Sequence, residues 1–336
     1  MKREDTVIET QNRTRKSRRN KLFILLFILP FLFAGGYCSY LYMKVKATAN
    51  HSYKELERGN VSTEREKAVE PLTDHISLLI MGVDESNGRQ KEYGNAIRTD
   101  ALLLATINKD DRSVKLLSIP RDSYVNIPSR GKKDKIAHAH VFGGVDSTIQ
   151  TVEQFLHVPV DYYVKFNFQS FIKIVDALGG IDVNVPITTM EQDSHDQANV
   201  IKLQQGQNHL NGEQALALAR TRHIDSDYMR GRRQQIVFEA IAKKALSVET
   251  IAKLGTIMEA IGTDMKTNLT LDDSIKIARN MIGKPFNMDR IQIQGEDQYI
   301  HDIYYYVPDD AELKKTIHVL QSHLNIANAS LEQTTP

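Results

Sequence analysis

An uninterrupted apolar segment near the start of the chain constrains its fold most strongly. Residues 22–43, LFILLFILPFLFAGGYCSYLYM, contain no charged side chain over 22 positions. A helix rises about 1.5 Å per residue, so this segment is long enough to cross a bilayer once. Pro30 and the Gly35-Gly36 pair are compatible with a span, because membrane helices tolerate both residue types. We therefore expect one transmembrane helix here.

The charges on either side of this segment predict its orientation. Residues 1–21 hold eight of the 43 Lys and Arg residues but only three of the 42 Asp and Glu residues, so the rest of the chain is slightly acidic. Positive charge is retained on the cytoplasmic side of a membrane. We expect residues 1–21 to form a cytoplasmic basic tail. The chain would then be a single-pass type II protein of the cell membrane, with everything after Lys44 outside the cytoplasm.

Two other interpretations of the N-terminus are weaker. The apolar run exceeds a usual signal-peptide core, and the only small-x-small site, at residues 47–49, lies beyond two lysines. A lipoprotein is disfavoured because Tyr37 rather than a small residue precedes Cys38. Cys38 is the only cysteine and lies in the apolar segment, so we expect no disulfide and no thiolate metal site in the outer domain.

Beyond the apolar segment, the pattern of the chain predicts one α/β domain. We expect a linker over residues 44–73, a globular domain over 74–325 and a tail over 326–336. ISLLIMG, DALLLATIN and SVKLLSI are short continuous apolar runs typical of strands buried on both faces. Helical spacing follows in AHVFGGVDSTIQTVEQFLHV, FQSFIKIVDALGG, QQIVFEAIAKKAL, TIAKLGTIMEAIG and DDSIKIARNMIG, with strands at YYVKF and DRIQIQG. This order favours a central mixed sheet flanked by helices on both faces.

An arginine-rich stretch suggests an anionic ligand. Five arginines lie between Ala217 and Gln235, in a chain whose net charge is only +1. The planar guanidinium offers paired donors that match two phosphate oxygens and keeps its charge at any working pH. The alternative is a solvated helical face.

Charged residues also gather at three predicted strand ends. Asp84 follows the first strand, Arg98 and Asp100 lie two apart at the start of the second, and Arg121 follows the third. Residues two apart on a strand point the same way. Magnesium takes oxygen ligands, usually one or two carboxylates with phosphates and water, which Asp84 and Asp100 could supply. Taken singly, such an aspartate is more often a helix cap or a turn residue.

The order of these segments resembles a known family. The succession is GVD…RTDALLLATI…LLSIPRDSYV…KIAHAHVFGG…YYVKFNFQSFIKIVDALGGIDVNVP…GQNHLNGEQALALARTR…DYMRGRRQQ. Over about residues 75–247 it is similar to the LytR-CpsA-Psr family of bacterial cell-wall enzymes, most closely to its teichoic-acid ligase branch. The resemblance implies transfer of an anionic glycopolymer from a polyprenyl pyrophosphate carrier to a peptidoglycan hydroxyl, with release of polyprenyl phosphate.

The resemblance also implies roles for single residues. The family's magnesium ligands fall on Asp84 and Asp100. Its catalytic, pyrophosphate-binding arginines fall on Arg98, Arg121, Arg220 and Arg222. The later part of the signature adds Asp227 as a catalytic residue and Arg230, Arg233 and Gln234 as substrate-binding residues. Arg232 lies outside that pattern, where a solvated helix residue is expected. Such a site suits phosphoryl transfer, which is catalysed mainly by positioning and by cations that neutralise charge.

The chain departs from the family pattern at two places. Ala137 and His140 stand where the family often has an asparagine and an aromatic residue, and the stretch Glu85–Asn95 makes the spacing between the two aspartates longer. Both changes bear on substrate detail. His138 and His140 lie two apart on an expected helix, where side chains do not face one another, so they are not expected to share a metal.

Three other activities remain open on the sequence. A pyrophosphatase would use water in place of the sugar hydroxyl, and a non-catalytic protein would only hold the lipid-linked polymer. A DNA-binding regulator is disfavoured, because the arginines lie on the outer side of the membrane in an acidic region without a DNA-binding motif. The sequence leaves undetermined the polymer, the length of the acceptor glycan, the general base and the oligomeric state. It also leaves open whether the segments at residues 166–178 and 234–246 line a lipid groove or only the core.

Overall fold

The computed structural model describes residues 39–326 apart from residues 41, 85–96, 223, 252–256, 258–261 and 263. The chain divides into two compact units, residues 1–47 and 48–336. In the first unit, residues 39, 40 and 42–47 are helical. The predicted basic tail and all but the last few residues of the predicted span lie outside the described residues. Among the residues that are described, no helix has the length and apolar content that crossing a bilayer requires.

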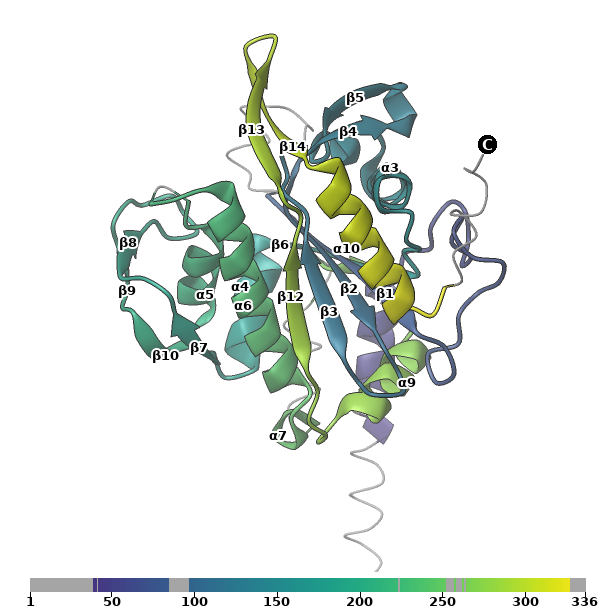
Figure 1. Ribbon diagram of the computed structural model, residues 1–336. Coiled ribbons are helices and arrows are strands. Elements are labelled where there is room, and N and C mark those ends of the chain that lie inside the picture. The colour runs from purple at the N-terminus through teal and green to yellow at the C-terminus, as the bar shows by residue number, and fades with distance from the viewer. Residues whose placement is uncertain are drawn as a thin grey trace, which may run out of the picture. The chain divides into compact units, whose positions relative to one another are not determined.

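A six-stranded mixed sheet forms the centre of the second unit (Figure 1). Its order is β11-β6-β1-β2-β3-β12, with β1 parallel to β6, β3 parallel to β12 and the other neighbours antiparallel. The strands are β1 Ile76–Val83, β2 Thr99–Ile107, β3 Val114–Ser118, β6 Tyr162–Asn167, β11 Lys266–Thr267 and β12 Met288–Gln292. The continuous apolar runs therefore predicted the three central strands.

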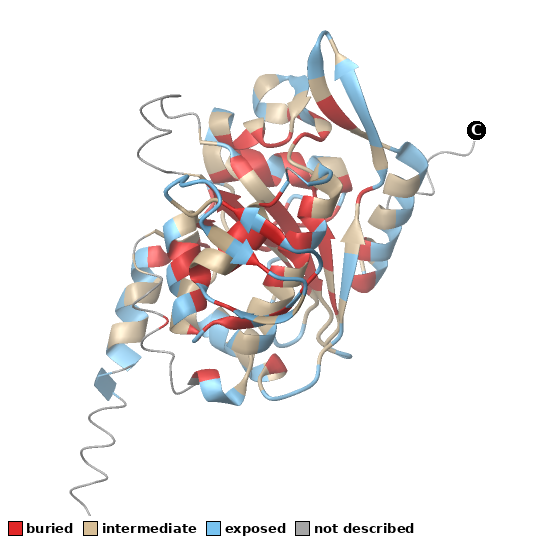
Figure 2. Ribbon diagram, turned by 90° about the vertical axis from the view of Figure 1, so that its left-hand side faces the viewer, coloured by how far each residue is buried: buried red, intermediate tan, exposed pale blue. Residues whose placement is uncertain are grey.

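Helices cover both faces of this sheet, because successive residues of the central strands point to opposite sides. Leu79 and Met81 of β1 pack with α3 and α10 on one face, whereas Ile80 packs with α4, α5 and α6 on the other. The buried residues accordingly gather at the sheet and the helix faces against it (Figure 2). The helices are α3 His138–Leu156, α4 Phe168–Ala177, α5 Gly212–Arg220, α6 Asp227–Ala245, α7 Val248–Ile251, α9 Leu271–Met281 and α10 Asp310–His323. The expected mixed sheet with flanking helices is confirmed.

Four two-stranded sheets extend this frame, and none of them was predicted from the sequence. They pair β4 with β5, β7 with β10, β8 with β9 and β13 with β14. Their bounds are β4 Tyr124–Ile127, β5 Lys132–Lys135, β7 Ile181–Val185, β8 Thr189–Glu191, β9 Ile201–Leu203, β10 Gly206–Leu210, β13 Gly295–Ile300 and β14 Ile303–Pro308. In Figure 1 the β13–β14 hairpin projects beyond the end of the central sheet, beside β4 and β5.

Local signals fix two of the helices. Asn167 caps α4 by accepting a hydrogen bond from the Ser170 amide, while the Ser170 hydroxyl accepts one from the Asn167 amide. In α3 the backbone leaves the helical conformation at Gly143 and Gly144, and Gly144 has a φ of 61° that favours glycine. The expected helix over this region is therefore kinked.

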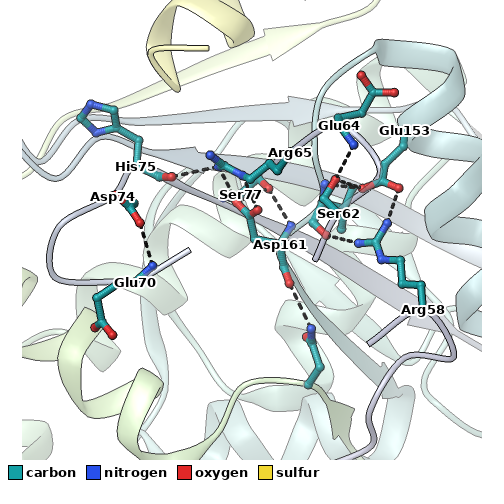
Figure 3. Close-up of polar contacts among 12 residues, drawn as sticks. Arg58, Ser62, Glu64, Arg65, Glu70, Asp74, His75, Ser77, Glu153 and Asp161 are labelled. Atoms are coloured by element: carbon teal, nitrogen blue, oxygen red, sulfur yellow. Dashed lines mark hydrogen bonds and ion pairs between the residues drawn. The ribbon is translucent and has the colours of Figure 1, made fainter. Parts of the chain in front are cut away.

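The segment expected as a linker is fastened to the domain by two buried ionic contacts (Figure 3). Arg58 pairs with Glu153 of α3, and Ser62 donates to the same carboxylate at 2.5 Å. Arg65 donates from Nε and Nη2 to Asp161 at 2.6 and 2.8 Å. Both carboxylates are almost fully buried and are therefore paired, as buried charges must be.

The second contact also holds the first strand of the sheet. Ser77 of β1 donates its amide and its hydroxyl to Asp161 at 2.8 and 2.9 Å. The compact unit begins at Thr48, so it includes most of the segment expected as a linker. The contacts that fasten this segment join residues more than 90 positions apart in the chain.

Candidate active site

Three strand ends meet at one edge of the sheet. Because β1 and β3 both run antiparallel to β2, the C-terminal ends of β1 and β3 lie beside the N-terminal start of β2. Asp84 follows β1, Asp100 is the second residue of β2, and Arg121 follows β3 and Pro120. The sequence separated these residues by up to 37 positions, whereas the sheet brings their elements together.

The strand register places three predicted residues next to the β1–β2 pair. Val83 lies opposite Thr99, and both are fully buried. Neighbouring residues on a strand point to opposite faces, so Asp100 of β2 points away from the side of Thr99, while Asp84 and Arg98 lie just outside the two strands. Asp84 and Asp100 are half-buried, and Arg98 is exposed.

Arg121 is the centre of a charged cluster. Its Nη1 donates to Asp100 Oδ1 at 2.6 Å, and its Nε lies 3.5 Å from Asp122 Oδ2 and 4.0 Å from Asp227 Oδ2. Burial acts to lower the pKa of Arg121, but the three carboxylates outweigh it and raise that pKa. The buried Nε has no hydrogen-bond partner among the described residues. An unpaired donor in a cluster of charges is suited to an anionic ligand.

Asp122 and Asp227 face each other and differ in their protonation behaviour. Burial raises the pKa of Asp227 above its usual range, and the neighbouring Asp122 carboxylate raises it further, against the opposing effect of nearby arginines. Burial also acts to raise the pKa of Asp122, but a bond from Lys135 Nζ at 2.8 Å and the charge of Arg121 hold it below its usual range. The pair therefore keeps Asp122 ionised and makes Asp227 the better proton acceptor near neutral pH.

Helix α6 brings Asp227 to this cluster because its first turns approach the end of β3 closely. A Cβ on Gly231 would lie 2.5 Å from Ser118 Oγ, so a larger residue here would require the serine side chain or the helix to shift. One turn later, buried Gln235 donates from Nε2 to main-chain carbonyls of β3 and β12 at 2.6 Å each. Ser226 caps the helix by accepting from the Met229 amide.

Arg230 adds a second buried guanidinium to the cluster. It is 7% exposed and donates from Nη2 to Asp227 Oδ2 at 3.1 Å. Burial lowers the pKa of Arg230, and the positive charges of Arg121 and Arg222 lower it further, although two aspartates oppose this effect. Arg222, which is exposed, therefore lies close enough to act on the same centre.

Arg233 has a different environment from the other arginines. It is 1% exposed, and its two terminal nitrogens donate to both Asp225 oxygens at 2.6 and 2.7 Å and to the Thr221 carbonyl at 2.6 Å. It thus clamps the connection between α5 and α6. Gln234 Nε2 lies 3.5 Å from the Asp100 carbonyl oxygen and is also buried. Both side chains are buried and contact the chain next to the site, Arg233 at Thr221 and Asp225, and Gln234 at Asp100.

Arg220 lies in a separate group of contacts. Its Nη1 donates to the Asp193 carbonyl at 3.3 Å and its Nη2 to Asp196 Oδ1 at 3.1 Å, while its Cζ lies 4.8 Å from the centre of the Phe168 ring. Within the described part of the chain, no hydrogen bond or ion pair joins Arg220 to Arg121 or Asp227. The structure therefore brings Asp100, Arg121, Asp227 and Arg230 into direct contact but leaves Arg220 outside that cluster.

The histidines and the extra arginine have ordinary environments. His138 Nδ1 lies 3.1 Å from Asp134 Oδ1, and His140 Nδ1 lies 2.9 Å from the Ile97 carbonyl oxygen. The two rings therefore have different partners, and His140 positions the residues just before β2. Arg232 is exposed on α6.

The apolar faces of α4 and α6 belong to the core. Phe171, Val175 and Val237 are buried in one cluster with residues of α5 and β7, and the partly buried Phe168 and Phe238 pack against it. This packing explains the three-and-four spacing of apolar residues in both helices without a bound lipid. It also leaves side chains at the edge of the cluster that are only partly covered.

The donor set at the sheet edge fits magnesium. Among the described residues no group of three or more His, Cys, Asp or Glu side chains is arranged to hold a metal. Magnesium requires fewer protein ligands, because one or two carboxylates with phosphates and water complete its shell. Asp84 follows the end of β1 and Asp100 lies near the start of the adjacent β2, and both are of this chemical type.

Sequence reasoning overlooked Lys135 as a member of the site. It lies on β5, a strand that no apolar pattern predicted, and its Nζ contacts Asp122. The only available signal was the basic sequence KKDK in a family-like segment.

Comparisons with known proteins bear out the family resemblance. The model of the LytR_cpsA_psr family matches residues 39–322. Among curated proteins, the chain is 37% identical over 325 residues to polyisoprenyl-teichoic acid–peptidoglycan teichoic acid transferase TagT of Bacillus subtilis, covering 95% of this chain and 99% of the relative. It is 38% identical over 315 residues to the corresponding transferase TagU of Bacillus cereus, covering 92% and 99%.

Solved structures show the same fold. TagT bound to LI-WTA superposes with a TM-score of 0.68 at 37% identity, covering 81% of this chain and 99% of that one. The LytR-CPS2A-psr family protein YwtF (TagT) with bound octaprenyl pyrophosphate lipid gives a TM-score of 0.64 at 34% identity, with the same coverage.

Proposed function

The chain belongs to the LytR-CpsA-Psr family, and we propose that it is an enzyme which attaches a teichoic-acid-type glycopolymer to peptidoglycan. The donor is the polymer on a polyprenyl pyrophosphate carrier, and polyprenyl phosphate is released. One observation carries the proposal: the chain matches nearly the full length of transferases named for this reaction, one of which has been solved with a bound polyprenyl pyrophosphate.

The charged cluster supplies the chemistry that this reaction needs. An acceptor hydroxyl oxygen attacks the phosphorus nearest the polymer, and the bond from that phosphorus to the bridging oxygen breaks. The polymer is then joined through a phosphodiester, and the lipid leaves as a monophosphate. Negative charge builds up on the phosphate oxygens during transfer, so preorganised cations accelerate the step.

The arginines divide this task according to their exposure. Arg98 and Arg222 are exposed, and we assign them to contacts with the incoming pyrophosphate. Arg121 and Arg230 lie deeper and are held by aspartates, so their orientation is fixed before the substrate binds. Arg220, which is stacked near Phe168, is assigned to the part of the donor further from Arg121.

Asp227 is our candidate for the general base. A base needs a pKa near the working pH, and burial together with Asp122 raises the pKa of Asp227 toward that range. Asp100 is less suitable, because its carboxylate accepts a bond from Arg121 at 2.6 Å and is the expected metal ligand. Asp227 would take the proton from the attacking hydroxyl.

We further propose that the enzyme uses magnesium, held by Asp84 and Asp100. When bound there, the ion would add positive charge beside the phosphates. The fit of the two carboxylates to oxygen-ligand chemistry supports this assignment. Membrane anchoring through residues 22–43, with the domain outside the cytoplasm, completes the proposal, because both the carrier lipid and the wall are reached from that side.

The proposal is tested with full-length protein in lipid vesicles containing the lipid-linked donor, magnesium and polymer-free peptidoglycan. A transferase gives polymer joined to peptidoglycan, a pyrophosphatase gives free phosphorylated polymer, and a binding protein gives neither. Asp100→Asn retains the shape of the side chain, so we expect it to slow transfer most strongly at limiting magnesium. An unchanged rate there would remove Asp100 from the metal site, and free polymer as the main product would replace transfer with hydrolysis.

A further inference from the structure

The β13–β14 hairpin carries an aromatic ledge, which we define as the exposed Tyr299 and the half-buried Tyr304. The two residues lie directly opposite each other on the antiparallel strands, with ring centres 5.8 Å apart at 66°. Tyr299 is 76% exposed, although a tyrosine ring is a large apolar surface to leave in water. Figure 1 shows the hairpin projecting beyond the end of the central sheet. Exposed aromatic surface of this kind commonly marks a binding site.

The base of the hairpin is joined to the candidate active site. The Tyr306 amide donates to the Asp122 carbonyl oxygen at 2.9 Å. Lys135, which bonds to the Asp122 carboxylate, also has its Nζ 5.4 Å from the centre of the Tyr304 ring. The charges of Asp122 and Asp227 help to raise the pKa of Tyr304, after burial and the neighbouring Asp297. The aromatic ledge therefore begins next to the reacting groups and leads away from them.

The hairpin is buried near its base and exposed toward its tip, since Tyr305 and Tyr306 are each 8% exposed and Tyr299 is 76% exposed. Tyr305 points to one face, where its ring packs on Tyr124 of β4 with centres 4.7 Å apart. Because side chains alternate, Asp297, Tyr299 and Tyr304 share the opposite face. The Tyr304 hydroxyl donates to Asp297 Oδ1 at 2.7 Å, which confirms that they lie together.

The charge of the hairpin selects between the two substrates. Residues 295–308 contain three acidic side chains and no lysine or arginine. The acidic side chains disfavour the anionic donor polymer around Tyr299, whereas Lys135 lies at the inner end of the ledge beside Tyr304 and the arginines at the sheet edge attract the polymer. A glycan strand has sugar rings whose C–H faces pack on aromatic rings and whose hydroxyls donate to carboxylates. Tyr299 of the ledge and the neighbouring Asp297 offer these two kinds of contact.

We propose that the aromatic ledge of the β13–β14 hairpin binds the sugar rings of the acceptor glycan and directs its hydroxyl toward Asp227. This assignment rests on the proposed transfer reaction and adds to it the location of the second substrate. Tyr299 is a specificity residue in this account and takes no part in the chemistry itself.

The test compares Tyr299→Ala with Tyr299→Phe in the full-length protein. Tyr299 is exposed, so both replacements should leave Tm close to that of the parent protein. For Tyr299→Ala we expect the KM for polymer-free peptidoglycan strands to rise roughly five- to twentyfold, the scale for a lost aromatic anchor, with kcat and the donor KM within about twofold. Tyr299→Phe keeps the ring and should stay within about twofold of the parent.

A second readout separates this inference from the proposed function. Binding of the protein to the same strands without donor should fall in Tyr299→Ala and persist in Tyr299→Phe, whether or not transfer occurs. Absence of transfer by the parent protein would count against the function but not against the ledge. An unchanged acceptor KM together with unchanged strand binding would overturn the ledge. A raised donor KM in Tyr299→Ala, or a lowered one in Asp297→Asn, would assign the hairpin to the polymer instead and would also overturn it.

Discussion

Arg232 and Arg233 are neighbours in α6 with opposite environments, and their replacement by lysine gives a matched pair. Arg233 is 1% exposed and makes three hydrogen bonds, to both oxygens of Asp225 and to the Thr221 carbonyl, whereas Arg232 is exposed. Lysine keeps the charge but replaces the planar fork with one ammonium group. In Arg233→Lys we expect the connection between α5 and α6 to loosen, and in Arg232→Lys we expect no change.

The size of this effect follows from burial. Breaking a buried ion pair typically costs about 3–5 kcal/mol. The Asp225 side chain is 26% exposed, so water can replace part of the lost contact. Lysine also retains a charge, and we therefore expect a loss of about 2–3 kcal/mol in the free energy of unfolding. In a domain of this size, each kcal/mol lowers Tm by roughly 2 °C, which gives about 4–6 °C.

Differential scanning calorimetry of both variants measures this directly, and transfer activity gives a second readout. Because the clamped connection carries Arg222 and leads into Asp227, Arg233→Lys should also slow transfer by about tenfold. Arg232→Lys should stay within about 1 °C and about twofold of the parent protein. A Tm for Arg233→Lys as high as that of Arg232→Lys would refute the clamp.

Three further outcomes are expected. Asp227→Asn should slow transfer about a hundredfold or more. The same variant should leave Tm at pH 7 unchanged or higher. The pKa of Asp227 is raised in the folded state, so its ionised form destabilises the fold once the pH exceeds that pKa. A lower Tm with retained activity would be the contrary result. Burial lowers the pKa of His323 from about 6.5 in the unfolded chain to about 4, so its contribution to stability is complete above pH 6.5 and is lost as the pH falls toward 4. Between pH 7 and 5 the free energy of unfolding of the wild type should therefore fall by about 1 kcal/mol, after allowance for solvent screening. His323→Asn should not show this loss. Urea unfolding at both pH values measures this, and exposed His318→Asn is the control that should behave like the wild type. Arg220→Lys should slow single-turnover transfer roughly thirty- to a thousandfold, against less than twofold for Arg232→Lys, and equal mild losses would place Arg220 on an ordinary basic surface.

The sequence predicted the frame of the domain because that frame depends on local patterns. The central strands are apolar on both faces, and this leaves a continuous run of hydrophobic residues that needs no knowledge of partners. Helices α3, α4, α6 and α9 show the three-and-four spacing of a buried face. The family resemblance, confirmed by the comparisons, then brought Asp84, Asp100 and the arginines into one hypothesis.

What could not be predicted depends on contacts between distant residues. Arg58 and Arg65 looked like linker residues because their partners, Glu153 and Asp161, lie about 95 positions away. Polar strands such as β13 carry no apolar alternation, so the hairpin and its ledge were missed. Nothing in the sequence distinguished Arg233, which bonds to Asp225 and Thr221, from the other arginines of the same signature.

The fate of one phosphorus atom tests the central claim most directly. In a donor labelled only at the phosphate next to the polymer, transfer by the full-length protein should place the label in a phosphodiester on insoluble peptidoglycan and release unlabelled polyprenyl phosphate. The label should remain attached when the lipid is extracted, and it should be absent with Asp227→Asn. Label recovered on the released lipid, or on free polymer with none on peptidoglycan, would contradict the account.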